Sequence, residues 1–198
     1  MHKGILVLVA ALLASSCAST GATTTFVSSW RSPTAQALQV KGSKVAASVM
    51  LNDVASRRNA EDKLASEITA RGAKGVPMYQ IVEPGGDQAA ARAALTSADI
   101  QGVVVMTPSE ADLTSNTRID YGAPPYNTYW NGYFDYAPAN PPSSKPVSVD
   151  TLIYSLRQNQ LVWAGKSKTT DAKTVDSLIT EVTAATADEL KRLMLLTQ

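Results

Sequence analysis

The sequence predicts an α/β fold of the α+β kind, in which a mixed sheet of about five strands is covered by helices. Three observations lead to this fold class. Apolar segments and helix-forming segments alternate along the first half of the chain. Two strand-like segments separated by a short polar turn come later, and a long amphipathic segment follows them. The composition, with 44% hydrophobic and 18% charged residues, is that of an ordinary globular domain.

The first half of the domain is expected to build the parallel part of the sheet. The expected strands span residues 26–33, 44–51, 75–82 and 99–106, and the expected helices span residues 56–71 and 88–97. Gly72 follows the first helix, and glycine readily adopts the left-handed conformation that ends many helices. The order strand, helix, strand, helix, strand predicts parallel strands joined by right-handed crossovers.

The last quarter of the chain is expected to add an antiparallel hairpin and a covering helix. The hairpin strands are residues 147–156 and 161–168, with the polar residues 157–160 as the turn. Trp163, in the second strand, is expected to fill the core under the helix rather than to bind a ligand. The core-facing stripe of that helix comprises Val175, Leu178, Ile179, Val182, Thr186, Leu190 and Leu193.

The N-terminus has the features of a secretory signal peptide. A short basic head precedes an apolar run at residues 4–14, which is too short to cross a bilayer as a helix. Small residues then lead into Cys17, the only cysteine of the chain, as in the lipobox of bacterial lipoproteins. We therefore expect a signal peptide at 1–16, a lipidated tether at 17–25 and a single domain at 26–198. Ordinary cleavage that leaves Cys17 as a free thiol is the alternative.

Several classes of function are disfavoured by composition. The formal net charge of +1 gives no long-range field that would attract nucleic acid. The only histidine, His2, lies in the predicted signal peptide, and Cys17 is predicted to be acylated. The mature chain would then have no free imidazole or thiol for triad or zinc chemistry, so we expect no enzyme, no cofactor and no metal site. Arg58 and Glu61 are interpreted as a surface ion pair on the first helix.

One long segment, residues 107–146, is not expected to belong to the framework of sheet and helices. It holds seven of the ten prolines and five of the seven tyrosines. Asn131-Gly132 at its centre favours a type I′ hairpin with an aromatic residue at each flanking position. These candidate binding residues are Tyr129, Trp130, Tyr133 and Phe134. Such a hairpin suits contact with a protein, a glycan or a membrane interface. The other interpretations are that it covers an open sheet face or has no fixed position.

The order of several motifs resembles that of a family of uncharacterised proteobacterial lipoproteins. The motifs are SSWRSP at 28–33, SRRNAEDKLASEITARGAKGVPMY at 56–79, IQGVVVM at 100–106 and VDTLIYSLRQNQLVWAGKSK at 149–168, with the helix after them. This family is similar in fold to the N-terminal domain of TolB and to CsgG. The resemblance, with Ala18 after the anchor, implies outer-membrane attachment facing the periplasm and implies no established activity.

Two functions are therefore predicted as alternatives. The first is a non-catalytic cell-envelope lipoprotein, a structural or interaction module whose partners are the membrane, through its lipid anchor, and an envelope protein or wall component. The second is a glycan-binding or small-ligand-binding protein that uses the aromatic segment, with hydrolase activity from carboxylates that the sequence does not identify.

Overall fold

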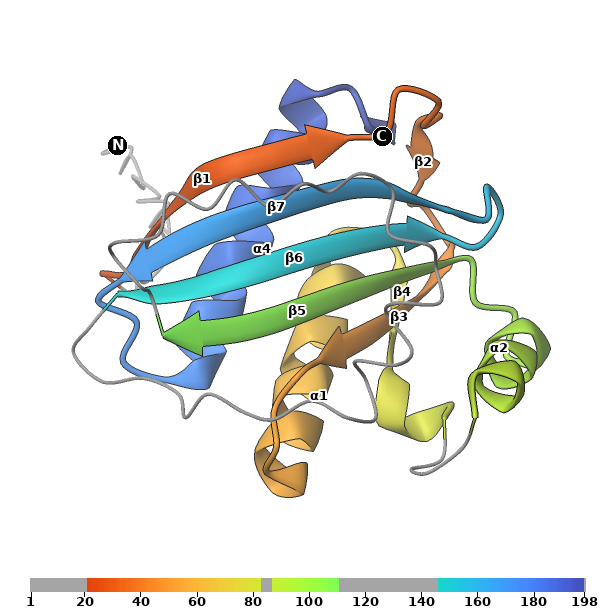
Figure 1. Ribbon diagram of the computed structural model, residues 1–198, viewed down its shortest axis with the longest axis horizontal. Helices are drawn as coiled ribbons and strands as arrows, with labels where there is room; N and C mark the ends of the chain where they lie inside the picture. Colours follow the sequence, from red (N-terminus) through yellow and green to blue (C-terminus); the bar gives the residue numbers. More distant parts are fainter. Residues whose placement is uncertain (1–20, 83–86, 111–145, 198) are drawn as a thin grey trace, which may run out of the picture.

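A six-stranded mixed sheet forms the centre of the protein in the computed structural model (Figure 1), which describes residues 21–82, 87–110 and 146–197. The strands lie in the order β1-β7-β6-β5-β3-β4. Their bounds are β1 Thr23–Arg31, β3 Lys44–Val49, β4 Lys74–Pro77, β5 Gly102–Glu110, β6 Val147–Ser155 and β7 Gln160–Thr170. Two short strands, β2 (Leu38–Gln39) and β8 (Leu196–Thr197), pair in parallel outside this sheet. The predicted α/β fold with a mixed sheet is confirmed.

The helices lie mainly on one face of the sheet. Those described are α1 Val54–Ala70, α2 Gln88–Ser97 and α4 Val175–Arg192, with a 3₁₀ turn, η1, at Met78–Gln80. Figure 1 shows α1 and α4 behind the sheet and α2 beside one end of it. Apolar residues of α1 and α4 form one core cluster with β3, β5 and β6. Residues of α2 belong to a second cluster, with Val103 and Tyr154.

The topology follows the predicted order of elements. Strand β3 is parallel to β4 and to β5, and the crossovers contain α1 and α2. Strands β5, β6, β7 and β1 are antiparallel neighbours. The main sheet has six strands rather than about five, because the outer segments β1 and β4 both pair with it. Thr23 already pairs with Thr170, so residues 23–25, expected in the tether, are part of β1.

Several predicted strand boundaries differ from the observed ones. The strand expected to end at Met106 continues to Glu110, so residues 107–110 of the expected long segment 107–146 belong to β5. The strand expected to reach residue 82 ends at Pro77, and η1 follows it. Met78 and Val82 are buried, so the apolar pattern there reflects burial in a turn beside α2 rather than an extended strand. The strand expected to begin at Asp99 begins at Gly102, because Asp99 adopts a left-handed conformation with a φ of 56° after α2.

Helix α1 has clear start and stop signals. The Asp53 side chain accepts a hydrogen bond of 2.8 Å from the backbone N–H of Ser56. Gly72 has a φ of 96°, which agrees with its predicted role as the C-terminal stop. Gly75 lets α1 approach β4 closely, since a Cβ atom there would lie 2.0 Å from the carbonyl oxygen of Ala65.

Helix α4 covers the sheet as its stripe predicts. Thr174 and Ser177 form a capping box at its start. Its buried residues are Leu178, Ile179, Val182, Thr183, Thr186, Ala187 and Leu190. Beneath it, Trp163 is fully buried, and the ring of Phe26 meets it edge-on at 5.5 Å between centroids. The predicted packing role of Trp163 is confirmed.

Candidate functional site

A cavity of about 810 Å³ lies between α1, α4 and the sheet. Ile68 of α1, Thr186 of α4 and Val104 of β5 are among its walls. Small-molecule sites in proteins typically have volumes of about 300–1,000 Å³. The size and the enclosure by three elements make this cavity the principal candidate site among the described residues.

Small core-facing side chains in the second half of α4 contribute to the cavity. Along α4, the core-facing residues change from Leu178, Ile179 and Val182 to Thr183, Thr186 and Ala187, before Leu190 in the last turn. Helix α1 stops nearby, and Gly72 and Ala73 follow it on the cavity wall. Val104 shows the effect in the central strand. It remains part-exposed, whereas Met106, on the same face of β5, is buried.

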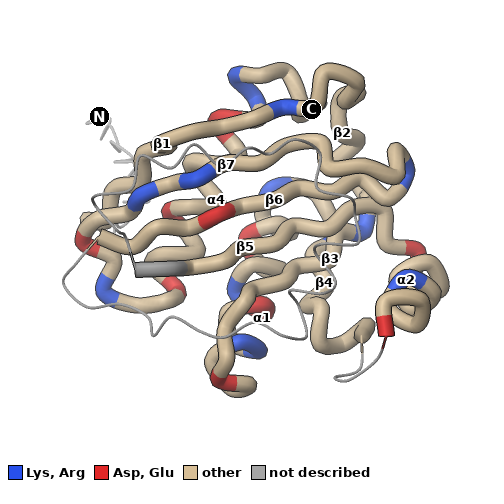
Figure 2. Tube along the Cα trace, in the orientation of Figure 1, with Lys and Arg blue, Asp and Glu red and all other residues tan. Residues whose placement is uncertain are grey.

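Cations surround the mouth of the cavity. Arg71 follows α1, Arg157 lies in the β6–β7 turn, and Lys191 lies in the last turn of α4; all three are exposed and line the cavity. We call these residues the cationic rim. The described lining contains no Asp or Glu. Elsewhere, charges of both signs are spread over the described elements (Figure 2). The mouth therefore favours an anion over a cation.

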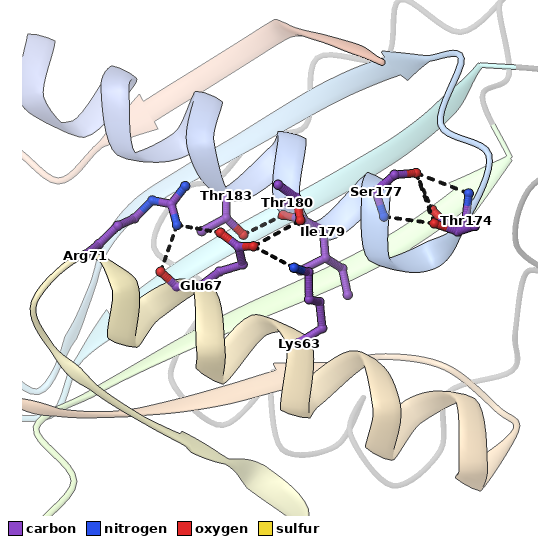
Figure 3. A network of polar contacts seen from close by, with 8 residues as sticks. All are labelled: Lys63, Glu67, Arg71, Thr174, Ser177, Ile179, Thr180 and Thr183. Carbon is purple, nitrogen blue, oxygen red and sulfur yellow. Dashed lines mark hydrogen bonds and ion pairs between the residues drawn. The ribbon is translucent and has the colours of Figure 1, made fainter. Parts of the chain in front are cut away.

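A partly exposed ion-pair network joins the two helices beside the cavity (Figure 3). Glu67 of α1 accepts a hydrogen bond of 3.0 Å from the Thr180 hydroxyl of α4. Its carboxylate also contacts Lys63 at 2.8 Å and Arg71 at 2.7 Å. Burial alone would raise the pKa of Glu67, but hydrogen bonds from Lys63, Arg71 and Thr180 outweigh it and lower the pKa to about 2. Glu67 thus stays ionised and holds the helices together where the hollow begins.

Two polar atoms on the cavity wall lack partners. Thr186 is only 5% exposed, and its hydroxyl has no hydrogen-bond partner among the described residues. The buried side-chain oxygen of Gln101 likewise has none among them. Most buried polar groups in proteins are paired, so unpaired groups on a cavity wall are positions where a ligand or water completes the bonding.

Glu61 is a second unusual group, on the other half of α1. It is fully buried and accepts hydrogen bonds from the backbone N–H of Val49 at 3.4 Å and of Tyr79 at 2.9 Å. Burial raises its pKa to about 7, against these backbone hydrogen bonds. The predicted surface ion pair with Arg58 is therefore wrong, and the Arg58 guanidinium instead lies 5.3 Å from the ring centre of Tyr79.

Glu61 lies at the carboxyl ends of β3 and β4, where α/β proteins commonly bind ligands. The cavity does not reach it, however, since its lining on α1 begins at Ile68. Glu61 is therefore a structural acceptor for two strand ends. Its burial had a weak signal in the sequence, because position 61 adjoins Ala60 and Leu64 on the apolar face of α1.

The candidate residues predicted from the sequence lie outside the described ranges. This applies to Cys17, Tyr129, Trp130, Tyr133 and Phe134. The cavity residues were not predicted. A usable signal was the replacement of large apolar residues by threonine and alanine along the α4 stripe.

The segments that carry these residues nevertheless join the sheet at one place. Thr24 pairs with Thr169, Thr169 with Val147, and Val147 with Glu110. This cross-strand row lies next to residues 1–20 on one side and 111–145 on the other. The cavity lies at the opposite end of the sheet, where β5 begins and β6 ends, as Gly102 and Ser155 line it.

Two further classes of site were examined in the same ranges. The part of the chain that the structure describes has no group of three or more His, Cys, Asp or Glu side chains placed to hold a metal ion. Within the described ranges, no helix combines the length and the apolarity that a membrane span requires.

Fold and site together define the class: an α/β domain with a solvent-open cavity beneath two helices. No protein-family model and no curated protein matches the chain. Two solved structures of the PelC dodecamer from Paraburkholderia phytofirmans, one of them a point variant, are similar to it. The variant is 16% identical, with a TM-score of 0.46, and the match covers 85% of this chain and 97% of that one. The other is 12% identical, with a TM-score of 0.48, and the coverages are 89% and 99%. At this level, no residue role follows from the likeness.

Proposed function

We propose that this chain is a non-catalytic lipoprotein of the bacterial cell envelope and acts as a binding module. Acylated Cys17 holds it in the outer membrane, and the domain faces the periplasm. The signal-peptide pattern and the motif resemblance to proteobacterial lipoproteins support this location. The cavity supports the binding function, because its volume of about 810 Å³ and its partly apolar walls suit a small molecule.

The observation that carries the proposal is the position of the cavity relative to the tether. The chain enters β1 at Thr23, at the end of the sheet opposite the cationic rim. An anchor at Cys17 therefore leaves the mouth of the cavity accessible in the periplasm. A mouth at the tethered end would have opened toward the lipid.

The aromatic residues of insertion 107–146 are proposed as a second contact surface, for an envelope protein or a wall component. Support comes from the row that contains Glu110 and Val147, because it places the two ends of the insertion beside the tether. Aromatic side chains with polar tips suit such a surface near a membrane.

The anchor is tested by changing Cys17 to Ser. Wild-type protein should incorporate a labelled fatty acid and fractionate with membranes. Cys17→Ser should lose the label and either leave the membrane fraction or accumulate as precursor. A wild type that takes up no label would exclude the lipid anchor.

The binding function is tested separately with the full chain carrying Cys17→Ser, which needs no detergent. The uncharged dye N-phenylnaphthylamine should become fluorescent at a saturable site. Thr186→Leu, which narrows the cavity, should weaken binding at this site. Ser66→Leu, an exposed change on α1 outside the cavity, should keep it. Absence of a saturable site in the parent chain would contradict binding in the cavity.

A further inference from the structure

We propose that the cavity binds a single long alkyl chain with an anionic head group, in its simplest form a fatty-acid anion. The tail lies between α1, α4 and the sheet, and the head group lies at the cationic rim. This inference rests on the binding function proposed for the cavity and adds the chemical class of the ligand.

The charge of the lining specifies the head group. Arg71, Arg157 and Lys191 line the cavity from three different elements, and no described lining residue is acidic. The nearest acidic partners lie outside the lining, where Arg71 contacts Glu67 and Lys191 contacts Asp188 at 3.4 Å. The whole chain has 18 basic and 17 acidic residues, so this imbalance is local. An arginine guanidinium also matches the geometry of a carboxylate or phosphate better than that of a neutral hydroxyl group.

The shape and polarity of the walls specify the tail. Ile68, Val104 and Leu190 line the interior, and the α4 wall runs from Thr183 to Lys191, which is about 12 Å along a helix. An alkyl chain fills such a space without needing polar partners. A glycan would bury many hydroxyl groups, and each would need a partner that apolar walls do not offer. The interior thus favours an alkyl tail over a sugar.

The unpaired hydroxyl of Thr186 gives independent support. It is nine-tenths buried, lies on the same wall and has no partner among the described residues. A hydroxyl can donate a hydrogen bond to an anionic oxygen, and such charge-assisted bonds are stronger than neutral ones. The Thr186 hydroxyl is itself buried, and rotation of its side chain would bring it to such a head group.

The test measures displacement of the dye from the Cys17→Ser chain by four ligands with the same dodecyl tail. The head groups are a carboxylate, a phosphate, an alcohol and an ammonium, all below their micelle concentrations. The carboxylate and the phosphate should displace the dye at lower concentrations than the alcohol, and the ammonium should be weakest. The order of carboxylate and phosphate distinguishes a fatty acid from an alkyl phosphate as the preferred anion.

A second series varies the tail of the carboxylate from six to sixteen carbons. Each added methylene should tighten binding about fourfold until the cavity is full, the factor that corresponds to burial of one methylene group. Affinity should then stop rising. A ligand that binds only to the surface charges would show no such dependence of affinity on tail length.

Two variants separate the head-group site from the tail site. The double change Arg157→Gln and Lys191→Gln removes exposed rim charges and leaves the helix network of Glu67 intact. It should weaken the carboxylate several-fold and leave the alcohol unchanged. Thr186→Leu should weaken binding of both, while Ser66→Leu should affect neither.

The outcomes separate this inference from the function on which it rests. Dye binding with no preference among the four head groups would overturn the anionic ligand and leave a general apolar site. No dye binding would overturn both, as when residues of this chain outside the described ranges fill the cavity. A carboxylate affinity that is unchanged in Thr186→Leu would place the ligand elsewhere and also overturn the inference.

Discussion

The layer between the sheet and helices α1 and α4 has a packed half and a hollow half. In the packed half, Leu64 and Leu178 are almost fully buried. In the hollow half, Thr186 and Ala187 occupy the equivalent face of α4, and Val104 of the sheet is part-exposed. Both halves lie under the same two helices, and the small side chains of α4 contribute to the difference.

The comparison shows how a small domain can keep both stability and a cavity. Packed apolar side chains supply most of the stability of a domain, and a cavity costs free energy in proportion to its volume. Concentrating large residues at one end and linking the helices through Glu67 and Thr180 lets the other end stay open. The following predictions test this division of roles, from the largest expected effect to the smallest.

Trp163→Ala should have the largest effect. The side chain is fully buried and contacts Phe26, so truncation should lower the free energy of unfolding by about 3–5 kcal/mol. Urea unfolding monitored by circular dichroism measures the change. An unshifted urea midpoint would show that the stability of the core does not depend on this residue.

Glu61 and Glu67 should give opposite dependences of stability on pH. The pKa of Glu61 is raised from 4.5 to about 7, so the folded state binds the proton more tightly than the unfolded chain. Its contribution is complete below pH 4.5 and is lost as the pH rises to about 7, a fall of about 3 kcal/mol in the free energy of unfolding. The pKa of Glu67 is lowered to about 2, so its contribution is present above pH 4.5 and is lost as the pH falls toward 2.

Two isosteric variants separate these two dependences of stability on pH. Glu61→Gln should remove the decline between pH 4.5 and 7, and Glu67→Gln should remove the loss below pH 4.5. Urea unfolding at a series of pH values measures both curves. A Glu61→Gln curve that still declines like the wild type would mean that Glu61 is ionised in the folded protein throughout this range.

The same enlargement should have different effects in the two halves. Ala60→Leu adds volume at a fully buried position of the packed half, and overpacking there should cost about 1–3 kcal/mol. Ala187→Leu adds the same volume toward the cavity and should leave stability unchanged or raise it. Thermal melts of both variants test the comparison, and equal losses would mean that no usable space exists beside Ala187.

The smallest effect should come from the end of α4 in the packed half. Thr174→Ala removes the side chain that accepts a hydrogen bond of 3.1 Å from the backbone N–H of Ser177. Loss of such a cap typically costs about 1 kcal/mol. Ligand binding in the distant cavity should not change. A variant with altered dye affinity would show that the two halves are coupled through α4.

The elements of the fold were largely predictable from periodicity. Ala60, Leu64 and Ile68 recur at helical spacing, and both α1 and α2 begin after aspartate caps, so these helices were placed within two residues. The hairpin of β6 and β7 followed from two apolar strands around a polar turn. The strand expected through residue 82 failed because buried apolar residues in a turn have the same composition as a short strand.

The cavity was not predictable in the same way. A helical stripe that includes Thr183 and Thr186 shows which face turns inward, but not how far that face stands from the sheet. The rim residues are 34 and 86 positions apart along the chain, from 157 to 191 and from 71 to 157, and only the fold brings them together. Glu61 was misread because a charged residue is usually exposed, and its backbone partners come from two other elements.

The direction of β1 has a consequence for how a ligand would travel. A tether of six residues, 17–22, spans at most about 20 Å, and the nine residues of β1 add about 30 Å toward the rim. With Cys17 acylated, the mouth can then lie up to about 50 Å from the bilayer surface. In that arrangement a ligand would enter from the aqueous phase rather than directly from the leaflet.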